Sequence, residues 1–250
     1  MITLSVVSHG QGRLIDRLFD DLARLHPAAL SRIVVTRNIA EDWQVPQQVA
    51  HCPVLVIDNP KPRGFGANHN AAFAHCATPY FAVVNPDIRL AEDPFPPVLA
   101  LLADARLALV TPQIIAPDGK REDFERALIT PWGLVQRRLN AAAASSVDWL
   151  AGMFMVLRSD AFRAVGGFDE RFFMYCEDAD LCARLRLDGA RFAVCAQSSV
   201  VHDAQRASHR SWRHLRWHLT SLMKFWLSSA FWRYRALLAR EHATMLRERG

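Results

Sequence analysis

Long apolar runs are missing from this 250-residue chain. The two longest candidates, 98–110 and 222–232, are broken by charged side chains, so neither reaches the ~18 uncharged residues that a membrane-spanning helix needs. The N-terminal residues have no basic segment ahead of their apolar stretch, unlike a signal peptide. We therefore expect a cytoplasmic protein that neither crosses a membrane nor is exported.

Cysteine is scarce as well. The five cysteines are scattered and odd in number, and no two are spaced as Cys-x-x-Cys. This distribution disfavours a disulfide framework and a structural zinc site, and it is typical of a reducing cytoplasm. Cys176 stands beside an acidic pair, but nothing in its spacing marks it as a nucleophile, so we interpret it as a buried thiol.

Two common glycine-rich nucleotide motifs are absent. The segment 59–70 carries Gly64 and Gly66 between an expected strand and an expected helix, but no Gly-Lys-Ser/Thr follows, so it is not a P-loop. His69 stands where the dinucleotide fingerprint has its third glycine. A helix start offers free N–H groups to an anion, yet taken alone this segment is weak support for a phosphate site.

Acidic side chains are rare toward the C-terminus. From Asp203 onward, ten Lys and Arg residues accompany three Asp and Glu residues, which gives this part a net charge of +7. The whole chain carries +5, so the part before Asp203 carries −2. A body of this charge gives no reason to expect a nucleic-acid groove.

The basic tail has the pattern of amphipathic helices. Within 209–240, apolar residues recur at helical spacing while Arg and Lys lie on other faces. Helices rich in Arg and Trp suit the surface of an anionic membrane, so we expect peripheral membrane contact at the inner face of the cytoplasmic membrane. The alternative is that these helices pack on the rest of the chain or on a second subunit in a homodimer.

Strand-like and helical patterns alternate over the first 110 residues, which predicts an α/β fold with a doubly wound, mostly parallel sheet. Ligands bind such sheets at the carboxyl ends of the strands. We expect one catalytic domain over 1–205, with halves 1–110 and 111–205, followed by a helical tail over 206–250. The expected strands are 2–7, 33–35, 54–57, 80–84, 107–110, 149–157 and 191–196, and the main helices are 13–25, 67–76, 97–105 and 177–187.

Acidic residues follow two of these segments. Asp87 comes directly after a strand that ends at Asn85-Pro86, where a carboxylate can hold Mg²⁺ or Mn²⁺; simple turn chemistry is the alternative. Glu177, Asp178 and Asp180 crowd the start of a helix, which indicates acid–base work, cation binding or plain capping.

These acidic segments and several polar or glycine-bearing segments follow one another in a characteristic order. Together they resemble the large inverting glycosyltransferase family commonly called family 2, which has the GT-A fold. The resemblance is strongest to its bacterial rhamnosyltransferase-type members, and it covers most of the chain from Leu4 to about His202. The residues that carry it are Ser5-Val6-Val7-Ser8-His9, Asn59…Gly64-Phe65…Asn68…Asn70, Asn85-Pro86-Asp87, Asp148-Trp149-Leu150-Ala151-Gly152, Gly167-Phe168-Asp169-Glu170-Arg171-Phe172-Phe173 and Glu177-Asp178-Ala179-Asp180.

The resemblance implies roles for individual residues. Asp87 matches the last acid of the metal-binding Asp-x-Asp motif, and His202 matches a late histidine that completes the metal site in relatives. Glu177-Asp178 matches the motif that supplies the catalytic base, of which we favour Asp178. The nucleotide-sugar is expected at Ser8, His9, Asn38, Asn59, Gly64, Phe65, Asn68, Asn85 and Asp87, and the acceptor or its sugar at Trp149, Gly152 and Asp180.

The implied activity is the transfer of a sugar, rhamnose or another hexose, from a dTDP- or UDP-linked donor to a lipid-linked or cell-surface polysaccharide acceptor. Mg²⁺ or Mn²⁺ would assist departure of the nucleoside diphosphate, and the base would take the proton of the acceptor hydroxyl. Two alternatives stay open. One is a sugar nucleotidyltransferase, although the segment Ser8–Arg13 only half resembles the glycine-rich loop of that class. The other is an inactive membrane-associated scaffold of the same fold.

Overall fold

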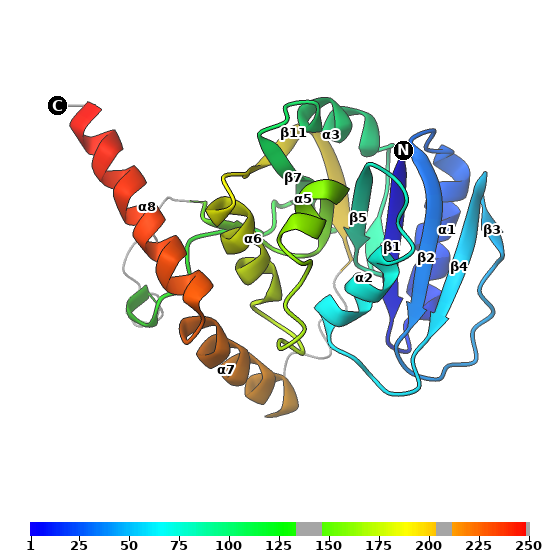
Figure 1. Ribbon diagram of the computed structural model, residues 1–250. Helices are drawn as coiled ribbons and strands as arrows, with labels where there is room; N and C mark the ends of the chain where they lie inside the picture. Colours follow the sequence, from blue (N-terminus) through cyan, green and yellow to red (C-terminus); the bar gives the residue numbers. More distant parts are fainter. Residues whose placement is uncertain (134–146, 204–211, 249–250) are drawn as a thin grey trace.

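Nine strands form one mixed sheet at the centre of the computed structural model, which describes residues 1–133, 147–203 and 212–248 (Figure 1). The strand order is β3-β4-β2-β1-β5-β10-β7-β11-β6. The strands are β1 (Ile2–Ser8), β2 (Leu30–Arg37), β3 (Gln48–Val49), β4 (Cys52–Asp58), β5 (Tyr80–Val84), β6 (Ile88–Arg89), β7 (Leu107–Ile115), β10 (Phe154–Arg158) and β11 (Arg191–His202).

Most of the sheet is parallel, as expected. β1 pairs in parallel with β2 and β5, β2 with β4, and β7 with β11. β10 runs antiparallel between β5 and β7, so these two neighbours point the same way as the rest. The carboxyl ends of β1, β2, β4, β5, β7 and β11 therefore meet at one edge of the sheet, where ligands of such folds bind.

Helices cover both faces of the sheet. Figure 1 shows α1 (Gly12–Leu25) behind it and α2 (Phe65–Phe73) in front of it. In α1 the buried side chains Ile15, Leu18, Phe19 and Leu22 recur at the spacing of one helical face, which explains why this segment packs as a helix. The remaining helices of the body are α3 (Phe95–Leu102), α5 (Ser159–Ala164) and α6 (Glu177–Leu187).

The segment 149–157 differs from its prediction as one strand. It forms β9 (Trp149–Leu150), which pairs with β8 (Glu125–Arg126), and then β10 in the main sheet, with a turn at 151–153 between them. An unbroken apolar run indicates burial but not the direction of the chain, so this break could not be predicted from the sequence. The turn matters because Gly152 lies in it, close to the expected catalytic acids.

The tail forms two helices at the end of the molecule opposite β3 (Figure 1): α7 (Trp212–Trp226) and α8 (Ser229–Glu248). α8 packs on α6, with Phe231 and Tyr234 buried and Arg186 of α6 paired with Glu241 at 2.6 Å. In the described part of the chain, no helix is long and apolar enough to pass through a membrane.

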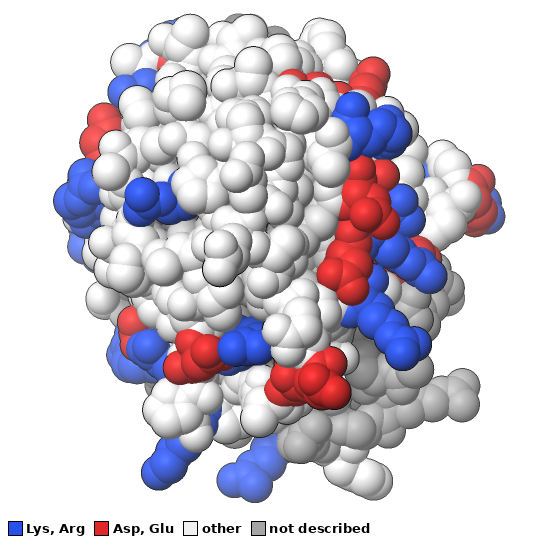
Figure 2. Space-filling view, turned by 90° about the vertical axis from the view of Figure 1, so that its right-hand side faces the viewer, with Lys and Arg blue, Asp and Glu red and all other residues white. Residues whose placement is uncertain are grey.

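Charged side chains are mixed in sign on the side of the molecule that carries β3 and β4. Figure 2 shows Lys and Arg interspersed with Asp and Glu on this face, around a broad uncharged area. The face therefore has no continuous basic patch of the kind that follows a nucleic-acid backbone.

Candidate active site

Three asparagines join the carboxyl ends of β2 and β4 to the start of α2. The Asn59 amide donates to Oδ1 of Asn38 (2.9 Å) and to Oδ1 of Asn68 (2.6 Å). Asn38 in turn accepts the backbone N–H of Arg63 (2.7 Å) and donates to its carbonyl oxygen (2.9 Å). These bonds fix the segment that leads into α2, and the nucleotide-sugar role expected for the three amides stays a prediction.

Ser8 and His9, at the end of β1, lie beside this asparagine group. Ser8 is buried and its hydroxyl accepts the backbone N–H of Gln11 (3.0 Å), which shapes the turn into α1. His9 is exposed, and its Nδ1 lies 3.3 Å from the Asn38 amide. The structure thus places both residues at the expected edge of the sheet, with the imidazole on the surface.

A glycine is needed at position 64 for a structural reason that could not be predicted from the sequence. A Cβ at this position would lie 2.7 Å from the carbonyl oxygen of Phe172 and 2.8 Å from Cα of Phe173. The next residue, Phe65, donates its backbone N–H to the Phe173 oxygen (2.8 Å). The glycine therefore lets the start of α2 approach the segment just before the acidic pair, and this close approach needs no ligand.

Asp87 and His202 come together at the sheet edge, as the resemblance implied. Nε2 of His202 lies 3.4 Å from Oδ2 of Asp87, and its Nδ1 lies 3.0 Å from Oε2 of Glu122. Burial acts to lower the pKa of His202, but the two carboxylates outweigh it and raise that pKa. Asn85, two residues before Asp87, donates its backbone N–H to the Met153 oxygen (2.9 Å), which ties this turn to the one that carries Gly152.

These side chains fit a divalent cation. Oδ1 of Asp87 is buried and has no hydrogen-bond partner, and it stands beside an imidazole nitrogen. Among residues 1–133, 147–203 and 212–248, no three His, Cys, Asp or Glu side chains are grouped so as to hold a metal by themselves. Mg²⁺ and related ions are commonly held by one or two protein ligands together with substrate phosphates and waters, so two protein ligands suffice.

The acidic pair at the start of α6 occupies two different environments. Asp178 is half-buried; its Oδ2 accepts the backbone N–H of Gly152 (3.1 Å) and its Oδ1 that of Ala179 (2.9 Å). Glu177 is buried, and its Oε2 has no hydrogen-bond partner. A Cβ on Gly152 would lie 3.5 Å from Phe65 and 3.6 Å from Cβ of Asp178, so these residues border one small region.

Burial raises the pKa of both carboxyl groups. In Asp178 the rise is opposed by the hydrogen bonds from Gly152 and Ala179 and by the positive charge of Arg126. Glu177 has less compensation, and the nearby charge of Asp178 raises its pKa further, well above the usual range. A carboxylate that is partly accessible and has a raised pKa is suited to accept a proton near neutral pH.

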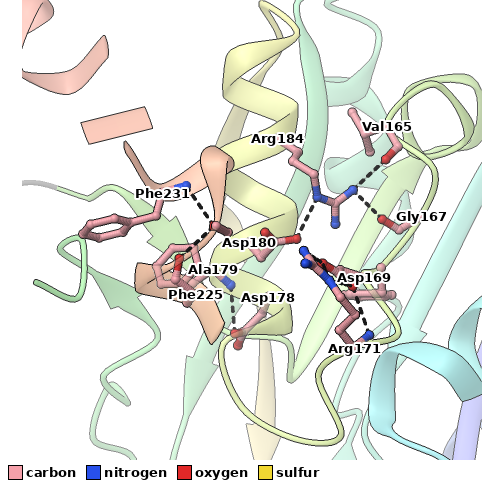
Figure 3. A network of polar contacts seen from close by, with 12 residues as sticks. Val165, Gly167, Asp169, Arg171, Asp178, Ala179, Asp180, Arg184, Phe225 and Phe231 are labelled. Carbon is pink, nitrogen blue, oxygen red and sulfur yellow. Dashed lines mark hydrogen bonds and ion pairs between the residues drawn. The ribbon is translucent and has the colours of Figure 1, made fainter. Parts of the chain in front are cut away.

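Asp180 faces away from this pair. Figure 3 shows its carboxylate directed at Arg184, with Asp178 at the lower end of the helix. Asp180 is buried and pairs with Arg184 at 2.7 Å, while Arg184 donates to the carbonyl oxygens of Val165 (2.6 Å) and Gly167 (2.7 Å). This network holds the turn before α6, and the acceptor role expected for Asp180 stays untested.

Trp149 is likewise buried. Its indole N–H donates to the Ala127 oxygen (3.0 Å), and the guanidinium of Arg126 lies 5.3 Å from its ring centroid. In this structure the ring supports β8 and Arg126, and stacking on a sugar stays a prediction.

Comparison with known proteins decides the family. Residues 6–166, more than half of the chain, match the family described as Glycosyl transferase family 2. The chain belongs to this family. It is therefore a glycosyltransferase, an enzyme that transfers a sugar, and the family expected from the sequence is confirmed.

Individual relatives agree with this assignment. Rhamnosyltransferase WbbL of Escherichia coli is 28% identical over 249 residues, which cover 90% of this chain and 92% of that protein. The N-acetylglucosaminyl-diphospho-decaprenol L-rhamnosyltransferase of Mycobacterium tuberculosis is 33% identical over 127 residues, which cover 47% of this chain and 41% of that protein. The homologues include rhamnosyl- and hexosyltransferases of polysaccharide biosynthesis.

A solved structure confirms the GT-A fold. The mannosyltransferase PcManGT from Pyrobaculum calidifontis, in complex with GDP-Man and Mn²⁺, matches with a TM-score of 0.64 at 17% identity, over 89% of this chain and 64% of that one. At this identity the likeness concerns the fold alone.

Two residues of this family 2 site were not predicted from the sequence. Glu122 reaches His202 across 80 positions of the chain, and Arg126 influences Asp178 across 52. Both stand in an irregular basic segment, where neither periodicity nor a motif marks individual residues. Their place after β7, at the same edge of the sheet, is the one signal that pointed to them.

Proposed function

We propose that this glycosyltransferase moves a sugar from a nucleoside-diphosphate donor to an acceptor hydroxyl with inversion, using Asp178 as base. The observation that carries the proposal is the position of Asp178. Its half-buried carboxylate lies beside Gly152 and Phe65, and its raised pKa suits it to take a proton. One displacement inverts the anomeric configuration, and no second nucleophile is needed.

The donor is proposed to lie along the sheet edge from β1 to β5. Ser8, His9 and the asparagine group would contact the nucleotide, whose base is uracil or thymine. The segment from Asn59 to Phe65 would pass close to the diphosphate, with the positive end of the α2 helix dipole supporting its negative charge. Because Asn38 follows the second strand where family members often have Asp, amide contacts to the base replace a carboxylate contact.

Asp87 and His202 would hold Mg²⁺ or Mn²⁺. The bound ion supplies Lewis-acid neutralisation of the leaving diphosphate. The buried Oδ1 of Asp87 and the imidazole nitrogen beside it support this assignment. Glu122 would orient the imidazole from its other nitrogen, in the way that outer carboxylates fix metal-binding histidines.

The acceptor is proposed to be lipid-linked or a growing surface polysaccharide, with rhamnose or another hexose as the transferred sugar. The names of the two rhamnosyltransferase relatives support rhamnose as the sugar, and one of these names includes a decaprenol-linked acceptor. The basic, apolar tail over 209–240 supports peripheral membrane contact at the inner face of the cytoplasmic membrane, where such an acceptor would be reached.

A thermal-shift screen of nucleotide sugars with and without Mn²⁺ tests the proposal. The true donor should raise the melting temperature of the parent only with metal. The Asp87→Ala variant should lose this metal-dependent shift, whereas Asp178→Asn should keep the shift and lose transfer. Full transfer by Asp178→Asn, or no response to any donor, contradicts the proposed site. Release of diphosphate from a nucleoside triphosphate would instead favour a nucleotidyltransferase.

A further inference from the structure

One face of α7 carries a row of exposed apolar side chains. Five of the ten large apolar side chains that are exposed in the described chain lie on it or directly after it, at intervals of three or four residues. Such spacing places them on one side of a helix. This outer stripe consists of Trp212 (86% exposed), Leu215 (49%), Leu219 (56%), Met223 (52%) and Leu227 (78%).

The side of α7 next to this stripe packs on the protein. Leu222 and Phe225 are buried there, and Ser221 donates its hydroxyl to the Met174 oxygen (2.8 Å). Packing of the tail on the catalytic domain therefore accounts for that face and leaves the outer stripe uncovered within the described chain.

The surroundings of the outer stripe are basic. Exposed Arg216 and Lys224 stand on α7 beside it, and exposed Arg233 and Arg235 follow at the start of α8. The sequence from Trp212 to Arg240 contains no Asp or Glu. Two copies of this surface placed face to face would bring cations together, which disfavours a symmetric dimer. Apolar side chains bordered by cations instead match an anionic lipid surface.

We propose that the outer stripe of α7 binds an anionic bilayer, with the helix lying in the interface and its cations among the lipid headgroups. The proposal rests on the proposed function, because membrane binding would bring the enzyme to a lipid-linked acceptor. It goes beyond a general tail–membrane contact, because it names one helix face and excludes the buried one.

The same helix holds the segment that leads to the catalytic acids. Lys224 donates to the Arg171 oxygen (2.5 Å), and the hydroxyl of Tyr175 lies 2.8 Å from Nδ1 of His214. Tyr175 and Cys176 both have positive φ (73° and 67°), a conformation that needs support from its surroundings. A bilayer-bound α7 would therefore carry the segment before Glu177 with it, which keeps the proposed base close to the surface.

Co-sedimentation with vesicles tests the proposal. The parent should bind vesicles of phosphatidylcholine mixed with phosphatidylglycerol, bind phosphatidylcholine alone more weakly, and lose binding as salt is raised. The double variant Leu215→Glu/Leu219→Glu should bind at least about tenfold more weakly, because it replaces two side chains of the inserted face with charges. The control Met245→Glu makes a similar change at an exposed site on α8 and should bind within about twofold of the parent.

A second variant separates the charge contribution. Arg216→Gln/Arg235→Gln leaves the outer stripe intact, so it should weaken binding to the anionic vesicles and not to phosphatidylcholine. Thermal melts of all variants should match the parent, since every changed side chain is exposed.

Three outcomes would overturn the proposal. The first is undiminished vesicle binding by Leu215→Glu/Leu219→Glu, and the second is an equal loss of binding in Met245→Glu. The third is a parent protein that binds no vesicles and forms a dimer, while the double variant is a monomer. The Asp178→Asn variant keeps the result separate from the proposed function: it should bind vesicles like the parent while transferring no sugar. If the parent binds vesicles but no nucleotide sugar, the result contradicts the proposed function and does not contradict membrane binding by α7.

Discussion

The adjacent carboxyl groups of Glu177 and Asp178 differ in burial and in hydrogen bonding. Asp178 is half-buried and bonded to two backbone N–H groups, whereas Glu177 is buried with one oxygen unpaired. Asp178 is therefore the one proposed to take a proton from a bound hydroxyl. The ionised form of Glu177 is instead expected to destabilise the folded state. Each has its own measurable consequence.

The pH profile of transfer should report the raised pKa of Asp178. A base must be deprotonated to act, so kcat/KM should fall as pH drops through that pKa. Arg126→Gln removes a positive charge that lowers this pKa, so the acid limb should move to higher pH. Arg126→Lys keeps the charge and should leave the limb nearly in place. Identical limbs in all three proteins would contradict the assignment of Asp178.

Glu177→Gln should stabilise the protein at neutral pH. The pKa of Glu177 is raised in the folded state, so the folded chain holds its proton more tightly than the unfolded chain. Stability is unaffected below the unfolded pKa of about 4.3 and is lost as pH rises toward the folded pKa. Urea denaturation should show a gain of roughly 1–3 kcal/mol at pH 7 that vanishes near pH 4.

Glu92→Gln is the matched control, because that side chain is exposed and its replacement should change stability by less than about 0.5 kcal/mol. A loss of stability in Glu177→Gln at neutral pH would show that the ionised carboxylate has a compensating partner.

Motifs in the sequence named candidate site residues, whose roles stay predictions, but not the side chains that contact them. Asp87, His202 and Asp178 follow from residue types placed after strands and from the family resemblance. Glu122 and Arg126 do not, because contacts between distant positions depend on the register in which β7, β8 and β11 meet. The contact expected between Gly64 and the nucleotide-sugar stays a prediction, and the sequence did not indicate that a Cβ there would meet the backbone of Phe172 and Phe173.

At the scale of elements, periodic segments were predicted closely and irregular ones were not. The helix 177–187 and the strand 2–7 match α6 and β1 within one residue. The strand expected at 191–196 continues to His202 through a register shift between Cys195 and Ser199. The segment 199–201 is strand-like in sequence, but the polar residues at that shift separate it from 191–196. This continuation of β11 brings His202 to Asp87. The sequence over 120–147 is basic and weakly periodic, which predicts a connection without regular structure. Residues 134–146 of it lie outside the described residues.

Gly64→Ala should disturb the contact between α2 and the segment before α6. The added methyl would meet backbone atoms at 2.7–2.8 Å, and backbone cannot rotate away as a side chain can. We expect a loss of roughly 1–3 kcal/mol in unfolding free energy and a fall in kcat, because the segment leads directly into Glu177. Urea melts and steady-state kinetics measure both effects.

Gly152→Ala is the comparison for stability. Its methyl would make ordinary contacts at 3.5–3.6 Å, so it should melt within about 0.5 kcal/mol of the parent. Equal destabilisation by the two substitutions would mean that the close approach at Gly64 is not the cause.

Over the whole molecule, the tail and the catalytic part share contacts across the expected boundary at residue 206, in line with the alternative that the tail packs on the rest of the chain. The Tyr234 hydroxyl donates to the Asp148 oxygen (2.6 Å), and Trp226 donates its indole N–H to the Ile129 oxygen (2.8 Å). These bonds join α7 and α8 to β9 and to the segment after β8. The division into a domain over 1–205 and a tail over 206–250 stays a prediction, and it can be tested through cooperativity.

Phe231→Ala should destabilise the catalytic part together with the tail. Phe231 is fully buried and packs edge to face on Phe225 of α7, with 5.3 Å between ring centroids, so its removal leaves a cavity between the two tail helices. The cost should be about 3–5 kcal/mol, and if α7, α8 and the sheet unfold as one unit, a single transition moves to lower temperature. Calorimetry of this variant beside Trp232→Ala, whose side chain is exposed, measures the difference. An unchanged main transition, with loss confined to a separate small one, would establish the tail as an independent unit. It would also remove the proposed link from α7 to Glu177 and Asp178.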